Sequence, residues 1–295
     1  MRCFQTPTVI SYLFAVSLIG QVAAAEDLPT QDVTFATVDG QELKLNLFLP
    51  EKTENPPLVV FIHGGGWRNG SFKNCQVKWL TDYGCAVASI GYRLSDKGIF
   101  PAQIHDCKAA IRWLRAHATD YQYDATHIVV AGTSAGGHLA LLLGVTGDNA
   151  ELEGTVGGNN DESSRVQGIV DYFGPSDFLL RSRNQPAKTE DPNGSVTLLL
   201  GGKVSENHDL AKLASPAHHV TPDDPPLLIL HGENDKTVYI GQAQRMEQAY
   251  KEAGLDVAFI VIPGAGHGGQ VFFTEEYRKP VVEFIKSQQR SDIKE

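Results

Sequence analysis

One stretch in the middle of the chain, residues 127–140, restricts the possible folds more than any other. A run of β-branched and apolar residues at 128–131 predicts a buried strand, and the run at 135–144 predicts a helix. Between them lies a Gly-x-Ser-x-Gly motif with Ser134 at its centre. A sharp turn of this kind strains the backbone of the serine and leaves room only for glycine two residues before and after it. The sequence therefore predicts a strand, a tight turn and a helix in direct succession.

Strand and helix patterns alternate along the rest of the chain. The first two strands alternate apolar and polar residues, as half-exposed antiparallel strands at a sheet edge do, and the later ones are continuous apolar runs typical of buried parallel strands. We therefore predict an α/β fold with an eight-stranded, mostly parallel sheet and helices on both faces. The predicted strands are 33–37, 44–49, 58–62, 86–90, 128–131, 166–172, 227–231 and 257–262, and the predicted helices are 73–83, 101–117, 135–144, 240–253 and 279–287.

The first 25 residues have the composition of a signal peptide. Arg2 supplies a positive charge, residues 9–19 are mostly apolar, and Val-Ala-Ala-Ala at 22–25 fits a cleavage site. An uncleaved anchor is the alternative, but the apolar run is short for a bilayer span. We predict a signal peptide at 1–25, a single domain at 26–295, export to the periplasm or the medium, and no stable membrane insertion. The segment 178–220 falls outside the strand–helix rhythm and is a candidate small cap over the site.

Charge and cysteine content exclude several classes of partner. The formal charge is −10, and it becomes −11 without residues 1–25, which carry Arg2 and no acidic residue. An acidic chain without a run of Lys or Arg is not expected to bind nucleic acid. Cys75, Cys85 and Cys107 remain; a Cys75–Cys85 pair is left open, and Cys107 is expected in the core. We predict no metal site, because no zinc pattern is present and residues 147–164, expected to be a mobile surface loop, lack calcium-ligand spacing.

The residues that follow two late strands supply partners for the serine. A nucleophilic serine needs a base, and the base needs a group that orients it. In this architecture the three occur along the chain as Ser, acid and His. Asp235 follows the strand 227–231 and His267 follows the last strand, so both lie at carboxyl ends of strands, where the site of such a sheet belongs. We assign Ser134 as nucleophile, Asp235 as orienting acid and His267 as general base.

Other acids and histidines compete for these roles. Glu233 is the alternative acid because it shares a loop with Asp235, whereas Asp256 precedes its strand and lies at the wrong end. His231 and His138 are alternative bases, one at a strand end and the other in the helix after the serine. We interpret both histidines as hydrogen-bonded structural residues.

The glycine-rich stretch after the strand 58–62 is a candidate oxyanion hole. It reads His63-Gly64-Gly65-Gly66-Trp67, and glycine lets the backbone approach a substrate carbonyl closely. The plain alternative is a flexible turn, which the position after a buried strand disfavours. His63 is expected to brace the loop, and Trp67 to line the pocket or pack against the loop. The predicted donors are the N–H groups of Gly65, Gly66 and Ala135, with Gly64 as the alternative in the loop.

Taken together, the motifs resemble those of α/β-hydrolase esterases, and most closely the bacterial feruloyl/acetyl-esterase type near the hormone-sensitive-lipase-like carboxylesterases. The resemblance covers nearly all of the chain after residue 25. It implies a serine carboxylesterase that hydrolyses short-chain acyl or aryl-acyl esters without a cofactor, with Ser134, Asp235 and His267 as the triad. The motifs are His63-Gly64-Gly65-Gly66-Trp67, Gly91-Tyr92-Arg93-Leu94, Pro101-Ala102-x-x-x-Asp106, Ala109-Ala110-x-Arg112-Trp113-Leu114, Gly132-Thr133-Ser134-Ala135-Gly136-Gly137-His138, Asp224-Pro225-Pro226 and His231-Gly232-x-x-Asp235.

The resemblance also sets expectations beyond the triad. It implies framework roles, in packing and an ion pair, for Tyr92, Arg93 and Asp106, and a small-molecule or carbohydrate ester as substrate. The Leu-Ser-Asp-Lys at 94–97 lacks the Ala-Pro-Glu of many lipase-like relatives, and the long N-terminal helical cap of many of them is absent, which favours an esterase over a lipase. Two alternatives stay open: a serine peptidase of the prolyl-oligopeptidase type, although the chain has no propeller-length N-terminal domain, and a non-hydrolytic ligand-binding relative. Acyl length and oligomeric state are not predicted.

Overall fold

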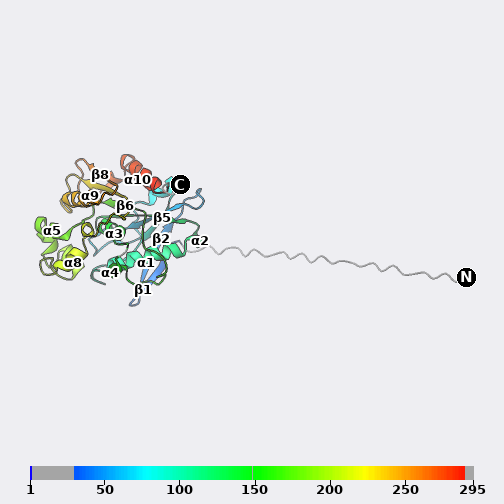
Figure 1. The fold of residues 1–295 in the computed structure, drawn as a ribbon, viewed down its shortest axis with the longest axis horizontal. Coiled ribbons are helices and arrows are strands. Elements are labelled where there is room, and N and C mark those ends of the chain that lie inside the picture. Colours follow the sequence, from blue (N-terminus) through cyan, green and yellow to red (C-terminus); the bar gives the residue numbers. More distant parts are fainter. Residues whose placement is uncertain (2–29, 148, 290–295) are drawn as a thin grey trace.

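A single mixed sheet organises the protein. The computed structural model describes residue 1 and residues 30–147 and 149–289, so the predicted signal peptide at 1–25 lies, apart from Met1, outside the described residues. The sheet has eight strands, as predicted. They lie in the order β1-β2-β4-β3-β5-β6-β7-β8, and helices flank the sheet (Figure 1). The strands are β1 (Val33–Val38), β2 (Gln41–Phe48), β3 (Pro57–Ile62), β4 (Ala86–Ile90), β5 (Asp124–Thr133), β6 (Gly168–Tyr172), β7 (Leu227–Gly232) and β8 (Val257–Ile262).

Strand direction follows the hydrophobic pattern. β1 pairs with β2 and β2 with β4 in antiparallel fashion, while all other neighbours are parallel. The predicted fold class is therefore confirmed. β5 lies between β3 and β6, and its last six residues are buried. The turn that carries Ser134 thus begins at the carboxyl end of a central strand.

Two layers of helices cover the sheet, and β3 shows how its residues divide between them. Leu58, Val60 and Ile62 pack with residues of α1, α3 and α9, whereas Val59 and Phe61 pack with residues of η1 and α10 on the other face. These elements are η1 (Lys78–Tyr83), α1 (Ala102–Ala116), α3 (Ala135–Gly144), α9 (Gly241–Ala253) and α10 (Glu275–Gln288), with the short α2 (Ala118–Tyr121) after α1 and η3 (Gln270–Phe273) before α10. None of the helices in the described ranges is long and apolar enough to cross a membrane.

Three predictions of local structure were wrong. The helix expected at 73–83 is a 3₁₀-helix confined to Lys78–Tyr83. β8 is an edge strand with solvent on one side, and Val261 is 41% exposed, although its apolar run suggested a fully buried strand. The segment 147–164 contains a short helix, α4 (Ala150–Glu153), whose Glu153 pairs with the buried Lys108 and Arg112. Local periodicity does not register these long-range contacts.

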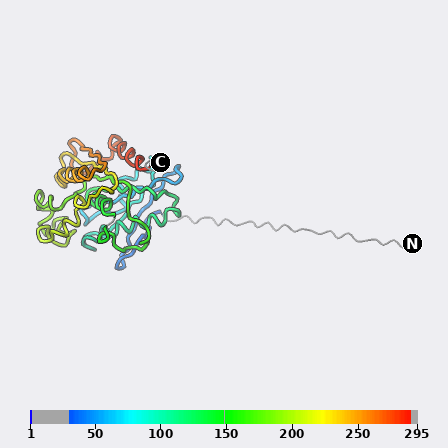
Figure 2. Tube along the Cα trace, viewed as in Figure 1, coloured from blue at the N-terminus to red at the C-terminus, as the bar shows by residue number. Residues whose placement is uncertain are grey.

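The segment between β6 and β7 contains several short helices and lies at one side of the sheet, as Figure 2 shows in green to yellow. Its apolar residues Val196, Leu199 and Leu200 belong to the same buried cluster as α1 and α3. The segment therefore shares the core of the sheet. Its elements are α5 (Phe178–Asn184), α6 (Pro186–Thr189), α7 (Ser195–Leu200), α8 (His208–Leu213) and η2 (Pro216–His218).

Candidate active site

Ser134 sits on the strained turn that the sequence predicts. Its φ is 54° and its ψ is −114°, and its N–H donates to Tyr172 O on β6 at 2.8 Å. A Cβ at Gly132 would collide with the Gly136 carbonyl, and one at Gly136 would collide with the carbonyl of Ile62 on β3. The two glycines therefore allow β5 and α3 to meet closely enough to project the Ser134 side chain from the sheet edge.

We expect Gly136→Ala to destabilise the protein by about 3 kcal/mol or more, because backbone atoms of β3 must move to accommodate the new methyl group. Urea unfolding measures this loss. Gly241→Ala is the matched control, since no heavy atom lies within 4 Å of a Cβ built there; its stability should change by no more than about 0.5 kcal/mol. Equal stabilities of the two variants would contradict the packing argument.

The structure brings the three predicted side chains together. His267 Nε2 lies 2.8 Å from Ser134 Oγ, and His267 Nδ1 lies 2.6 Å from Asp235 Oδ2. In the tautomer that this arrangement favours, Ser134 Oγ–H donates to Nε2 and Nδ1–H donates to Asp235. The loops after β7 and β8 place Asp235 and His267 beside the turn after β5.

Asp235 is held as an ionised acceptor. Its side chain is buried, and Oδ1 accepts the N–H groups of Thr237 at 2.8 Å and Val238 at 2.9 Å. Burial by itself would raise the pKa of Asp235, but the hydrogen bonds from His231, His267 and the Val238 N–H keep that pKa well below its usual range. The group is therefore a carboxylate wherever the protein is folded near neutral pH.

The alternative acids and bases have other contacts, although His231 Nε2 also lies 3.4 Å from Asp235 Oδ2. Glu233 accepts the Gly264 N–H at 2.9 Å from an exposed position, and Asp256 precedes β8 at the opposite end of the strand. His231 Nε2 donates to Val238 O at 2.8 Å, and His138 Nε2 donates to Ala214 O at 2.7 Å. Both histidines are fully buried, so they brace the chain as predicted.

Several contacts support the loop after β3. His63 Nδ1 donates to Gly64 O at 2.8 Å, and the ring of Tyr92 stacks on His63 with its hydroxyl donating to His63 O at 3.1 Å. A Cβ at Gly65, where φ is 119°, would collide with the Asn69 backbone. Trp67 is 1% exposed and packs edge-on against His138 and Phe178 beneath the loop. Through Trp67 the loop packs against His138 of α3 and Phe178 of the segment between β6 and β7.

The predicted oxyanion donors face the same space as the serine. Within the described part of the chain, the N–H groups of Gly65, Gly66 and Ala135 donate to no other protein atom. All three residues line one cavity with Ser134 and His267. The N–H of Ala135 belongs to the first turn of α3, where backbone donors have no partner within the helix. Together these three N–H groups can donate hydrogen bonds to a substrate oxygen on which negative charge develops.

The cavity has a volume of about 530 Å³ and is built from four loops and the segment between β6 and β7. That segment contributes Arg181, Lys188 and Asn193, which sequence reasoning did not place at the site. Their positions depend on how the segment packs over the sheet edge. The remaining lining residues are Gly65, Gly66, Trp67, Arg68, Gln76, Thr133, Ser134, Ala135, Phe173, Pro175, Ala187, Gly194, Ser195, Thr237, Val238, His267, Gly268 and Gly269.

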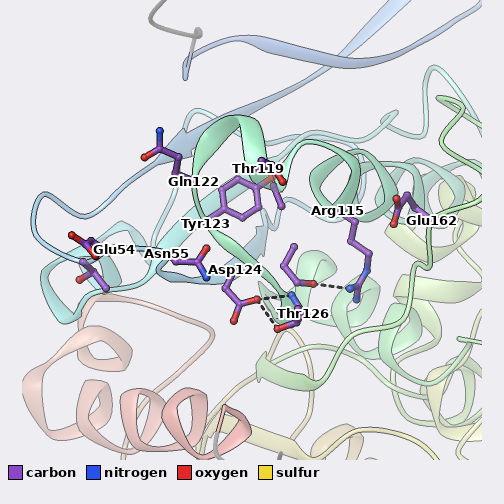
Figure 3. Close-up of a pocket in the computed structure, with 12 residues that line it drawn as sticks. Glu54, Asn55, Arg115, Thr119, Gln122, Tyr123, Asp124, Thr126 and Glu162 are labelled. Carbon is purple, nitrogen blue, oxygen red and sulfur yellow. Dashed lines mark hydrogen bonds between the residues drawn. The ribbon is translucent and has the colours of Figure 1, made fainter. Parts of the chain in front are cut away.

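A second cavity of about 870 Å³ lies at the opposite edge of the sheet, beside the start of β5 (Figure 3). Its Arg115 donates to the carbonyls of Ser163, Ala125 and Arg165, and Asp124 accepts from Thr126. The bonds of Arg115 link α1 to the start of β5 and to residues 163–165. Across the described ranges, no cluster of His, Cys, Asp and Glu is arranged to bind a metal ion.

The structure also tests the predictions for the framework residues and the cysteines. Arg93 and Asp106 form the expected ion pair, with Nη2 and Oδ1 2.7 Å apart. Cys75 and Cys85 are free thiols, so the pairing that the sequence left open does not form. Cys107 is buried in the core, as predicted.

A buried carboxyl on β6, Asp171, escaped sequence reasoning; a lone acid within an apolar strand was its only signal. Oδ1 accepts the Gly174 N–H at 2.8 Å, and Oδ2 has no partner among the described residues. Burial raises the pKa of Asp171 to about 7, against the lowering effects of His231 and the Gly174 N–H.

Because this pKa is higher in the folded than in the unfolded chain, the native state binds more protons between about pH 4 and pH 7. The free energy of unfolding therefore falls as the pH rises from about 4 to about 7. Asp171→Asn removes the titration, so relative to wild type it should gain about 2 kcal/mol between pH 5 and pH 8. Urea unfolding at the two pH values measures the gain. A constant difference would show that Asp171 does not titrate there.

The sheet order, the serine on the turn after β5 and its partners after β7 and β8 define an α/β hydrolase. The BD-FAE family model matches residues 45–250. The chain belongs to this family, among the α/β-hydrolase esterases of the type near hormone-sensitive lipase.

Known relatives agree with this placement. The chain is 31% identical to "Esterase LipC" of Mycobacterium tuberculosis over 73% of this chain and 54% of that protein. It is 29% identical to "Ethyl acetate hydrolase" of Pseudomonas putida over 83% and 78%. It is 32% identical to the structure "Truncated form of carbohydrate esterase from gut microbiota", with a TM-score of 0.79 over 88% of this chain and 95% of that one. The chain spans about half the length of the first curated relatives it matches.

Proposed function

We propose that the protein is a serine carboxylesterase. The observation that carries this proposal is the continuous contact from Asp235 through His267 to Ser134, with His267 and Ser134 lining a cavity. An acid, a base and a nucleophile within hydrogen-bond distance are what acyl transfer to a serine requires. The esterase names of the relatives support ester rather than amide substrates.

In the proposed reaction, His267 Nε2 takes the Ser134 proton while Oγ forms a bond to the ester carbonyl carbon. The negative charge that develops on the carbonyl oxygen is stabilised by hydrogen bonds from the N–H groups of Gly65, Gly66 and Ala135. The C–O bond to the alcohol then breaks, and His267 returns the proton to the departing oxygen. Water attacks the acyl-enzyme by the same route, releasing the acid and restoring Ser134.

We propose short acyl or aryl-acyl esters as substrates, including acetyl or feruloyl groups on carbohydrates. Support for a short acyl group comes from the relative named as an ethyl acetate hydrolase. Support for a carbohydrate alcohol comes from the similarity to a structure named as a carbohydrate esterase. A secreted or periplasmic location, proposed from residues 1–25, is compatible with such substrates.

Initial rates on nitrophenyl esters from acetate to laurate, on methyl ferulate and on acetylated xylan test the proposal. We expect hydrolysis that depends on Ser134 and is fastest for short chains. Hydrolysis of an anilide faster than the matching ester would favour a peptidase. Ligand binding without any release would favour a non-hydrolytic relative.

A further inference from the structure

The charges around the serine point to a particular kind of ester. We propose that the cavity binds esters that carry a carboxylate, and that Arg181 pairs with this carboxylate. The inference rests on the proposed esterase function and adds a substrate class to it.

The cavity is positive although the protein is acidic. The chain has 35 acidic and 25 basic residues, with a net charge of −10. The cavity is nevertheless lined by Arg68, Arg181 and Lys188, and no Asp or Glu is among its lining residues. A cavity lined by one sign of charge attracts ligands of the opposite sign.

Arg181 is the most deeply buried of these three cations. It lies on α5 and is only 3% exposed. Nη2 donates to Thr237 O at 2.9 Å, whereas the buried Nε has no partner among the described residues. Burial lowers the pKa of Arg181 to about 10, with the nearby charge of Asp235 opposing the shift, so the group is still charged at neutral pH. A buried charge with unfilled donors destabilises the protein unless a partner arrives.

Each of the other two buried cations among the described residues pairs with a carboxylate. Arg112, which is 1% exposed, pairs with Glu153, and so does the fully buried Lys108. Arg115, which lines the second cavity, donates to three backbone carbonyls, and Figure 3 shows one of these bonds. Arg112 Nε also lacks a hydrogen-bond partner, so the difference lies in the ion pair: among the described residues Arg181 pairs with no carboxylate. Arg181 lines the cavity of Ser134, where a substrate group can supply that carboxylate.

Two further cations, which come from two different segments of the chain, also line the cavity. Arg68 lies in the loop after β3 and donates to Asn193 O at 3.2 Å, which ties that loop to the segment between β6 and β7. Lys188 is half-buried on α6. Neither of them pairs with a carboxylate in the described ranges. A carboxylate near Arg181 would therefore be drawn in by two additional charges.

The carboxylate can belong to the acyl group or to the alcohol, and two substrate pairs separate these sources. On the acyl side, nitrophenyl hemisuccinate is compared with the neutral nitrophenyl butyrate. On the alcohol side, acetylated xylo-oligosaccharides that carry a glucuronic acid are compared with those that do not. For at least one pair, we expect the anionic member to have a kcat/KM about tenfold higher at low salt. This preference should shrink in 0.5 M NaCl because salt screens the attraction.

Two negative outcomes have different meanings. If both neutral esters are hydrolysed in a Ser134-dependent way and are preferred, the inference fails and the esterase function stands. If no ester is hydrolysed, the proposed function itself fails.

Substitutions then assign the preference to a residue. Arg181→Met should lower the anionic-to-neutral ratio of kcat/KM about tenfold, and Lys188→Met about threefold. Arg183→Met, on the exposed side of the same helix, is the control and should keep the wild-type ratio. If Arg181→Met lowers both rates equally, Arg181 only positions the Thr237 carbonyl and the proposal is wrong. Should Arg181→Met fail to fold, Lys188→Met and the salt dependence decide the question.

Discussion

Replacing Ser134 with alanine should lower kcat on a neutral nitrophenyl ester by about 10⁵-fold or more, because no other described hydroxyl reaches His267 Nε2. The backbone of Ser134 stays in the same turn, held by its N–H bond to Tyr172 O. The free energy of unfolding should therefore change little. Initial rates and urea unfolding on the same preparations measure both quantities.

A covalent probe separates this result from a general loss of structure. A fluorophosphonate should label wild-type protein at Ser134, located by peptide mass, and should leave Ser134→Ala unlabelled. Ser287→Ala, at an exposed serine on α10, serves as the control and should label fully. Wild-type turnover in Ser134→Ala, or labelling at another serine, would contradict the assigned nucleophile.

Asp235→Asn should lower kcat by about 10⁴-fold, since an amide neither stabilises the imidazolium nor favours the His267 tautomer with a proton on Nδ1. Glu233→Gln is the matched control from the same loop. Because Glu233 contacts only the Gly264 N–H from an exposed position, its activity should stay within about twofold of wild type. The opposite ranking of these two variants would transfer the acid role to Glu233.

Asp235→Asn should also lower the free energy of unfolding, by an amount that depends on pH. The pKa of Asp235 is held well below its usual range in the native state, so its ionised form stabilises the fold above the unfolded-state pKa of about 4. This stabilisation is lost as the pH falls through the folded-state pKa. Asp235→Asn should thus be less stable than wild type at pH 7, and the gap should narrow toward pH 3.

Much of the fold is predictable because its signals are short-range. Apolar runs ended by Gly, Pro and Asp mark all eight strands, and the helix at Ala135–Gly144 was predicted to the residue. Two of the errors, those at β8 and at residues 147–164, share one cause. Whether β8 has a neighbour on its outer side, and whether residues 147–164 contact buried cations, depends on segments distant in sequence.

The amino-acid sequence alone was enough to locate the strained turn at Ser134 and the order of serine, acid and histidine at strand ends, because the parallel sheet brings those ends to one edge. The sequence also assigned the acid role to Asp235, with Glu233 of the same loop as the alternative, but only the tertiary structure shows which contacts separate the two acids. The backbone N–H groups of Thr237 and Val238 orient Asp235 toward His267, while Glu233 bonds to Gly264. The positive charge of the cavity could also be recognised only in the folded structure. Arg181 reaches it only because the segment between β6 and β7 packs its apolar residues into the common core, and no local pattern encodes a contact of that range.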